Sequence, residues 1–330
     1  MKIWYDACTG KHMRYGAAIA RRLRRAGLEV ILTTRKHPDT LGVAQAVGEE
    51  PLVIGKYAPS SLSARVEESA RRTLKFLELF EGNVPDVAIS HQSPELCRTA
   101  FGLNIPIILT ADTPRAVAVN KLTIPLATKV VASEAIPTRF FKDYGAKEIV
   151  KFKGVDEVAW MKGFKPSQTF DFKKPLIVVR QIETNASYAM GKADVTLDVS
   201  RKLSKLATVL FLTRYVKNKI PGLKIMEEFA DSPSITSYAD LVIGAGGTIS
   251  REAALQGVPS IVVSEIGHTY VNEYLAKKGF PIFFTDASHV LSCAKRYLGK
   301  SFDVESRLAR LENPLDTIEH LVRNYGGKLD

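Results

Sequence analysis

The sequence predicts two tandem doubly wound α/β domains, each built on a parallel sheet. Short β-branched runs alternate with amphipathic segments of helical length along most of its 330 residues, a length that suits two domains better than one. An irregular stretch, residues 154–175, interrupts the alternation and is typical of a linker between domains. Because strands that alternate with helices pair in parallel, we expect helices on both faces of each sheet.

The first predicted domain covers residues 1–160. It begins with a strand over 2–7 and a helix over 13–25, which Gly27 ends. A long helix is expected over 61–81, where apolar residues recur at helical spacing. The other predicted strands are short apolar runs, most of which lead into helices: 29–34, 51–55, 87–90, 105–110 and 129–132.

The second predicted domain covers residues 161–330 and repeats the alternation. Its predicted strands are 176–179, 208–212, 241–243, 260–263 and 281–284. The final segment, 304–324, is expected to be helical with an interruption at Pro314, and its last helix is a candidate for packing back on the first domain. Two such domains place a cleft between the carboxyl ends of their sheets, where ligands of these folds bind.

Composition narrows the class of protein. Hydrophobic residues make up 45% and charged residues 25%, as in ordinary soluble proteins. No apolar run approaches the roughly 20 residues of a membrane span, and the N-terminus does not read as a signal peptide. The three cysteines are too few and too scattered for a disulfide framework or a zinc cluster. We therefore expect a cytoplasmic protein without a metal site.

The net charge of +11 favours anionic partners. The densest basic runs are Arg21-Arg22 with Arg24-Arg25 and Arg71-Arg72 with Lys75. No aromatic interleaving or helix-turn-helix pattern accompanies them, so we expect no nucleic-acid partner. Two interpretations stay open: a solvated helix face, or a peripheral contact between the first domain and anionic membrane lipid.

The strongest chemical signal is the loop Gly244-Ala-Gly-Gly-Thr-Ile-Ser-Arg-Glu, which follows an apolar strand and opens a helix ending near Gly257. Glycines allow a ligand to approach the backbone, and a helix N-terminus presents N–H groups that suit a diphosphate. A Walker A loop and the full Gly-x-Gly-x-x-Gly spacing are both excluded; a plain tight turn stays open. The predicted phosphate-binding residues are Gly244, Gly246, Gly247, Thr248 and Ser250, with Glu252 expected on a ribose diol.

Charged residues at strand ends complete the expected chemistry. Arg180 and Arg214 each follow a strand of the second domain and are candidate phosphate cations, although Arg180 could instead pair with Glu183. The candidate catalytic bases of the first domain are His12, His91 and Asp112, each placed after a predicted strand. The structural alternatives are a cap for His12 and loop or turn roles for His91 and Asp112.

Residues 239–264 resemble the donor-binding element of the GT-B glycosyltransferase superfamily. They are similar both to UDP-N-acetylglucosamine 2-epimerases and to the N-acetylglucosaminyltransferase of peptidoglycan lipid synthesis. The segment with His268, Asn272 and Glu273 resembles the part of those transferases that contacts the donor sugar.

Two further segments resemble these enzymes with one change each. Residues 9–13 resemble the Thr-Gly-Gly-His loop of the transferase, with Lys11 in place of the second glycine. Residues 180–185 resemble the His-Arg-x-Glu-Asn stretch of the epimerases without its histidine, which counts against epimerase chemistry.

Nearly the whole chain resembles an uncharacterised family of archaeal and bacterial proteins predicted to be glycosyltransferases. The segments that carry this resemblance are 4–6, 93–95, 112–114, 154–159, 178–180 and the glycine loop. The resemblance implies a GT-B fold of two Rossmann-like domains. It also implies a metal-independent transferase that takes a nucleotide sugar as substrate, needs no cofactor and acts on a glycan or lipid-linked acceptor of the cell envelope. An epimerase and a non-catalytic binding scaffold are the alternatives.

Overall fold

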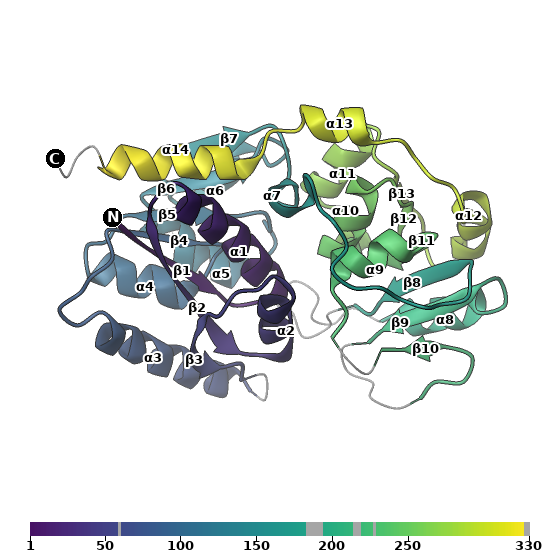
Figure 1. The fold of residues 1–330 in the computed structure, drawn as a ribbon, viewed down its shortest axis with the longest axis horizontal. Helices are drawn as coiled ribbons and strands as arrows, with labels where there is room; N and C mark the ends of the chain where they lie inside the picture. The colour runs from purple at the N-terminus through teal and green to yellow at the C-terminus, as the bar shows by residue number, and fades with distance from the viewer. Residues whose placement is uncertain (59–60, 183–193, 214–218, 227–228, 327–330) are drawn as a thin grey trace. The chain divides into compact units, whose positions relative to one another are not determined.

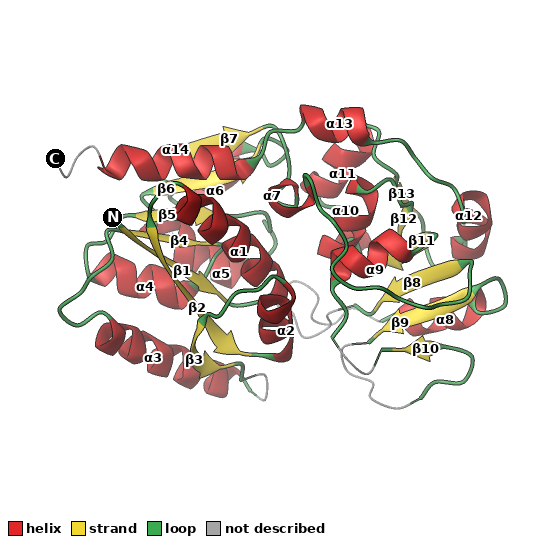
Figure 2. Cartoon of the chain, in the orientation of Figure 1, coloured by secondary structure: helices red, strands yellow, loops and turns green. Residues whose placement is uncertain are grey.

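A computed structural model describes residues 1–58, 61–182, 194–213, 219–226 and 229–326. The chain divides into two compact units, Met1–Trp160 with Glu312–Asp330, and Met161–Leu311. Each unit is a parallel sheet with helices on both faces (Figure 1, Figure 2), so the predicted fold class is confirmed. Among the described residues, no helix is both long and apolar enough to cross a membrane.

The first unit contains a seven-stranded sheet in the order β3-β2-β1-β4-β5-β6-β7. Its strands are β1 (Lys2–Ala7), β2 (Glu29–Lys36), β3 (Leu52–Lys56), β4 (Val87–Ser90), β5 (Ile107–Thr110), β6 (Lys129–Ser133) and β7 (Ile149–Phe152). Its helices are α1 (Gly10–Arg25), α2 (Pro38–Ala46), α3 (Leu62–Leu79), α4 (Pro94–Gly102), α5 (Val117–Thr123), η1 (Ile124–Leu126), α6 (Thr138–Asp143) and α14 (Pro314–Gly326). The short α7 (Val158–Met161) lies at the division between the units.

The helices of the first unit form two layers. α1 and α2 pack on β2, whereas α3 packs on β3 and α4 on β4 and β5. The central strand β1 pairs with β2 on one side and β4 on the other, and residues 3–7 of β1 are buried. A strand buried on both faces is mostly apolar, as β1 is apart from Asp6, and such runs can be identified in the sequence.

The last helix, α14, returns to the first unit and packs against α1 and β6 (Figure 1). Pro314 begins this helix, as proline at a first helical position commonly does. Arg22 of α1 pairs with Asp316 at 2.9 Å and with Glu319. Arg24 pairs with Glu49. Part of the basic run of α1 is therefore engaged within the first unit.

The second unit contains a six-stranded sheet in the order β10-β9-β8-β11-β12-β13. Its strands are β8 (Leu176–Arg180), β9 (Thr208–Leu212), β10 (Lys224–Ile225), β11 (Leu241–Gly244), β12 (Ser260–Val262) and β13 (Ile282–Phe284). Its helices are α8 (Thr196–Leu203), α9 (Ser232–Tyr238), α10 (Thr248–Leu255), η2 (Glu265–Gly267), α11 (Tyr270–Lys277), α12 (Val290–Tyr297) and α13 (Glu305–Arg310).

Alternation along the strands builds two cores in the second unit. In β8, Ile177 and Val179 pack toward α8 and α12, whereas Leu176 and Val178 pack toward α9 and α10. Successive side chains of a strand point to opposite faces, so each strand contributes to both cores.

Candidate functional site

Each sheet has a point where the strand order reverses. In the first unit the reversal lies between β1 and β4, and in the second between β8 and β11. Open α/β sheets bind ligands at the carboxyl ends of the strands that flank such a point. His12 and His91 follow β1 and β4, and Arg180 and Gly244 end β8 and β11. Each unit therefore carries one candidate site at its own reversal point.

The site of the first unit is a cluster of titratable side chains around the ammonium group of Lys11. Lys11 forms an ion pair with Asp112, lies 2.9 Å from Asp156 and lies 3.6 Å from Glu157. All four side chains are at most 12% exposed. The ammonium group thus supplies positive charge among carboxylates that would otherwise repel one another.

His91 and Asp112 are held by several partners. The ring nitrogens of His91 lie 2.7 Å from the Thr110 hydroxyl and 3.3 Å from the Asp112 carboxylate. The Thr113 hydroxyl also donates to Asp112 at 2.8 Å. These contacts fix both side chains and fit orienting roles better than that of a mobile base.

His12 occupies the first turn of α1, where its N–H donates to the hydroxyl of the capping residue Thr9. Its ring lies edge-on to His91, with centroids 4.8 Å apart. The buried Nδ1 of His12 has no hydrogen-bond partner among the described residues. Burial and the neighbouring His91 and Lys11 hold the pKa of His12 well below its ordinary value, so the ring is neutral near pH 7.

A second buried cluster lies beside β1, around Arg72 of α3. Its guanidinium group donates to Asp6 at 2.8 Å and to the carbonyl of Ile54 at 2.8 Å, and it lies 3.1 Å from Glu95. The carboxylates Asp6 and Glu95 could join Cys8 in holding a metal ion, but Arg72 already supplies the positive charge there. We interpret this cluster as structural.

The site of the second unit is the glycine loop between β11 and α10. Gly244 lies against Arg180, because a Cβ at Gly244 would come within 3.4 Å of the Arg180 carbonyl oxygen. Gly246 has a φ of 73°, which favours glycine. Gly247 is the N-terminal cap of α10; it is exposed and faces open space. The predicted loop thus leaves Gly247 and the half-buried Thr248 accessible to a ligand.

Asn272 of α11 holds this loop in place. Its fully buried amide donates to the carbonyls of Gly246 at 2.7 Å and Gly267 at 2.8 Å. Arg251 donates to the Gly246 carbonyl at 3.3 Å and to the Asn272 side-chain oxygen at 3.2 Å. Both amide hydrogens of Asn272 are therefore used within the protein, and its predicted contact with a sugar stays a prediction.

The other predicted residues of the second unit differ in exposure. Ser250 and Glu252 are fully buried, and Glu252 accepts a hydrogen bond of 2.6 Å from Ser232. His268 and Glu273 are about half exposed, 3.9 Å apart at their closest atoms, and follow the turn at Gly267 that touches the glycine loop. Their roles stay predictions. Arg214 and Glu183 lie outside the described residues.

Comparison with known proteins gives the family. Residues 1–327 match the model of a family described as "Protein of unknown function (DUF354)". The chain belongs to this family. An uncharacterised protein of Methanocaldococcus jannaschii is 30% identical to it, with 98% of each chain covered.

Solved structures resemble this DUF354 chain in fold. Streptomyces sp. SF2575 glycosyltransferase SsfS6 with thymidine diphosphate has a TM-score of 0.60 at 18% identity, covering 98% of this chain and 99% of its own. S. aureus MnaA with UDP has a TM-score of 0.71 at 15% identity, covering 99% and 97%. The UDP-GlcNAc 2-epimerase of M. jannaschii has a TM-score of 0.66 at 14% identity, covering 98% and 99%. These likenesses support the GT-B fold; a particular relation to the peptidoglycan transferase stays a prediction.

Several residues of the first site were not among the predicted site residues. Lys11 was noted only as a replacement for glycine, and Asp156 and Glu157 fall in the stretch interpreted as a linker. The signal that could have found the two carboxylates is β7, a short and mostly apolar strand that ends shortly before them at Phe152. Tyr15 was also missed; its buried hydroxyl has no hydrogen-bond partner among the described residues.

Proposed function

We propose that this DUF354 protein is a glycosyltransferase that takes a nucleoside diphosphate sugar as donor and needs neither a metal ion nor a cofactor. The observation that carries the proposal is Gly247, an exposed glycine with open space around it that caps α10 at the reversal point of the second sheet. A helix N-terminus there offers N–H groups to a diphosphate, with the Arg180 guanidinium as the candidate cation.

The first unit supplies the proposed acid–base chemistry. Of the three predicted bases, His12 has a half-buried and neutral ring, whereas both ring nitrogens of His91 and the carboxylate of Asp112 are engaged. In the proposed reaction His12 takes the proton of an acceptor hydroxyl. The acceptor oxygen bonds to the anomeric carbon of the donor, and the bond from that carbon to the diphosphate oxygen breaks. The diphosphate leaves with the bonding electrons.

The donor site can be tested by substituting Gly247. A Gly247→Ala methyl group meets no atom within 4 Å, so the fold should tolerate it, but the methyl occupies space that a phosphate group needs. We expect UDP, TDP, GDP or CDP at about 100 times its dissociation constant to add about 2.7 kcal/mol to wild-type stability. Gly247→Ala and Arg180→Ala should abolish the shift, and Arg201→Ala, which changes an exposed arginine of α8, should retain it. No shift with any of the four nucleotides contradicts the proposal.

Epimerisation of the donor sugar is the second candidate. It is favoured by the fold likeness to the M. jannaschii epimerase and by the several acid–base groups of the Lys11 cluster. An epimerase converts its sugar nucleotide without any acceptor, whereas a transferase releases the nucleoside diphosphate only as sugar is transferred. Incubation of the bound sugar nucleotide alone, followed by NMR of the sugar protons, separates the two. Binding without turnover under either condition would favour a non-catalytic scaffold.

A further inference from the structure

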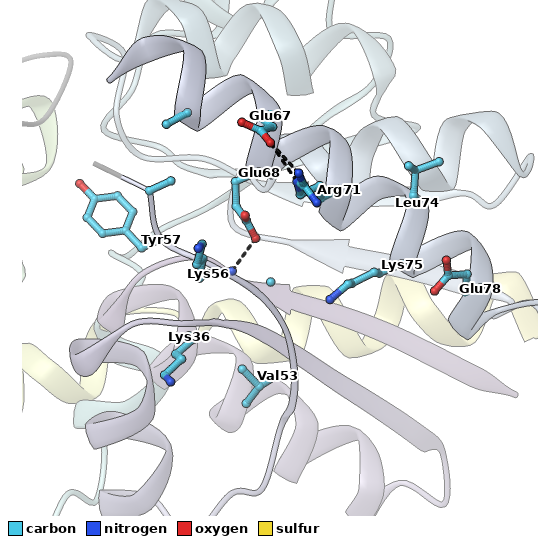
Figure 3. Close-up of a pocket in the computed structure, with 13 residues that line it drawn as sticks. Lys36, Val53, Lys56, Tyr57, Glu67, Glu68, Arg71, Leu74, Lys75 and Glu78 are labelled. Carbon is cyan, nitrogen blue, oxygen red and sulfur yellow. Dashed lines mark hydrogen bonds and ion pairs between the residues drawn. The ribbon is translucent and has the colours of Figure 1, made fainter. Parts of the chain in front are cut away.

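A cavity lies in the first unit, away from the reversal point, between the edge strand β3 and the long helix α3. Its volume is about 1060 Å³ (Figure 3). Two hydrogen bonds join α3 to β3 at this cavity. Arg72 of α3 donates to the carbonyl of Ile54, and Glu68 of α3 accepts from the backbone N–H of Lys56 at 2.8 Å. The cavity is thus part of the folded unit.

Cations predominate among the unengaged charges of this cavity. Lys36, Lys56 and Lys75 line it, are exposed, and have no ion-pair partner among the described residues. Figure 3 shows Lys75 extending from α3 toward β3. Of the acidic residues at the cavity, Glu67 pairs with Arg71 at 2.6 Å and Glu68 is used by the Lys56 backbone. The backbone hydrogen bond leaves the charge of Glu68 in place, so the three lysines exceed Glu68 and Glu78 by one positive charge, which favours an anionic group.

Apolar side chains continue from the cavity along the outside of α3. Val53 and Leu74 line the cavity and are 47% and 60% exposed. From Leu74, exposed apolar residues recur at intervals of four through Ala70 to Val66 and Leu62, the last two 70% and 71% exposed. Residues four apart are neighbours on a helix surface, so these side chains form an oblique stripe that extends roughly 18 Å along α3 and turns part of the way round it.

We propose that the cavity binds the anionic head of an amphiphile, a lipid phosphate with one apolar chain, and that the stripe from Leu74 to Leu62 receives the chain. The lysines complement the charge of the phosphate, and the exposed apolar residues are neighbours along the helix instead of being scattered singly. Binding of this amphiphile does not depend on nucleotide binding by the second unit. Only the identification of this amphiphile as the acceptor rests on the proposed transferase function.

The test measures the affinity of the full chain for geranyl phosphate, geraniol and inorganic phosphate by calorimetry. We expect geranyl phosphate to bind most tightly. The triple variant Lys36→Gln, Lys56→Gln, Lys75→Gln should weaken geranyl phosphate binding by roughly tenfold or more, because three charge-assisted contacts are lost. The double variant Val53→Ser, Leu74→Ser should also weaken it by roughly tenfold or more, because less apolar surface is buried.

Matched controls lie elsewhere on the same unit. Lys121→Gln, Lys142→Gln, Lys147→Gln makes the same charge change at exposed lysines, and Val117→Ser, Leu122→Ser makes similar apolar changes at residues 49% and 57% exposed. Both controls should keep wild-type affinity, and UDP-induced stabilisation should be equal in all variants. If inorganic phosphate binds as well as geranyl phosphate, or the controls lose as much affinity, the proposal is overturned. A wild-type dimer that Val53→Ser, Leu74→Ser dissociates would also overturn it, since a second copy would then cover this face.

Discussion

The side-chain amide of Asn272 donates a hydrogen bond of 2.7 Å to the carbonyl of Gly246. This bond joins α11 to the glycine loop across 26 positions of sequence. The same amide reaches the carbonyl of Gly267, so one buried side chain holds two turns at the carboxyl edge of the sheet. Asn272 therefore fixes the shape of the loop that we propose as the nucleotide site.

We expect Asn272→Ala to lower both stability and nucleotide affinity. The substitution removes two buried hydrogen bonds, each worth about 0.5–1.5 kcal/mol. Each carbonyl keeps one other donor, Arg251 at Gly246 and the Thr269 N–H at Gly267. Chemical denaturation measures the first effect and calorimetry with UDP or TDP the second. The control is Asn324→Ala, at an exposed position of α14. An Asn272→Ala protein with wild-type denaturation and nucleotide affinity would show that the loop does not depend on this side chain.

Gly246 and Gly299 form a matched pair for testing the loop. Both have left-handed backbone angles, with φ of 73° and 74°. A Cβ at Gly299 meets nothing within 4 Å, whereas one at Gly246 lies 2.6 Å from the Asn272 amide nitrogen and 2.8 Å from the Gly267 Cα. Gly299→Ala should cost about 1 kcal/mol for its backbone angle alone, and Gly246→Ala roughly 3 kcal/mol because a clash is added. Equal unfolding free energies for the two variants would contradict this packing.

Arg71 and Arg72 are adjacent in sequence, but we expect their substitution to have very different effects on the stability of the fold. Arg72 is 1% exposed between Asp6 and Glu95, whereas Arg71 is 64% exposed and pairs with the exposed Glu67. Arg72→Met leaves buried carboxylates without their cation, which typically costs 3–5 kcal/mol. Arg71→Met should unfold at nearly the wild-type denaturant midpoint. Equal denaturant midpoints for the two variants would contradict the buried ion pairs of Arg72 with Asp6 and Glu95.

The depressed pKa of His12 predicts a pH dependence of stability. Because burial disfavours the protonated ring in the folded chain, protons bind the unfolded chain more readily. The neutral ring of His12 therefore makes its full contribution to the free energy of unfolding above the ordinary pKa of about 6.5. This contribution is lost as the pH falls below that value, by at most about 1.4 kcal/mol per pH unit. Urea unfolding at about pH 7.5 and about pH 5.5 should show this slope in wild type and a smaller one in His12→Gln. His320→Gln, at an exposed ring of α14, should keep the wild-type slope.

The sequence predicted local features well. Glycines between a strand and a helix determine a loop through their own backbone freedom, so the loop from Gly244 to Gly247 was identified with its strand and helix. The Lys11 cluster depends instead on which strand ends meet, and Asp156 follows β7, a strand that was not among the predicted ones. The role of Asn272 in the loop likewise depends on a contact between elements distant in sequence.

The return of α14 to the first unit has a consequence for protein synthesis. The chain leaves the first unit after Trp160 and comes back with Glu312, so the second unit is one continuous stretch and the first is not. The N-terminus leaves the ribosome first, and the helix that pairs with Arg22 of α1 emerges only after the whole second unit. The second unit can thus fold on the nascent chain before α14 is available to complete the first unit. A premature stop near the C-terminus would therefore damage the part of the protein that was made first.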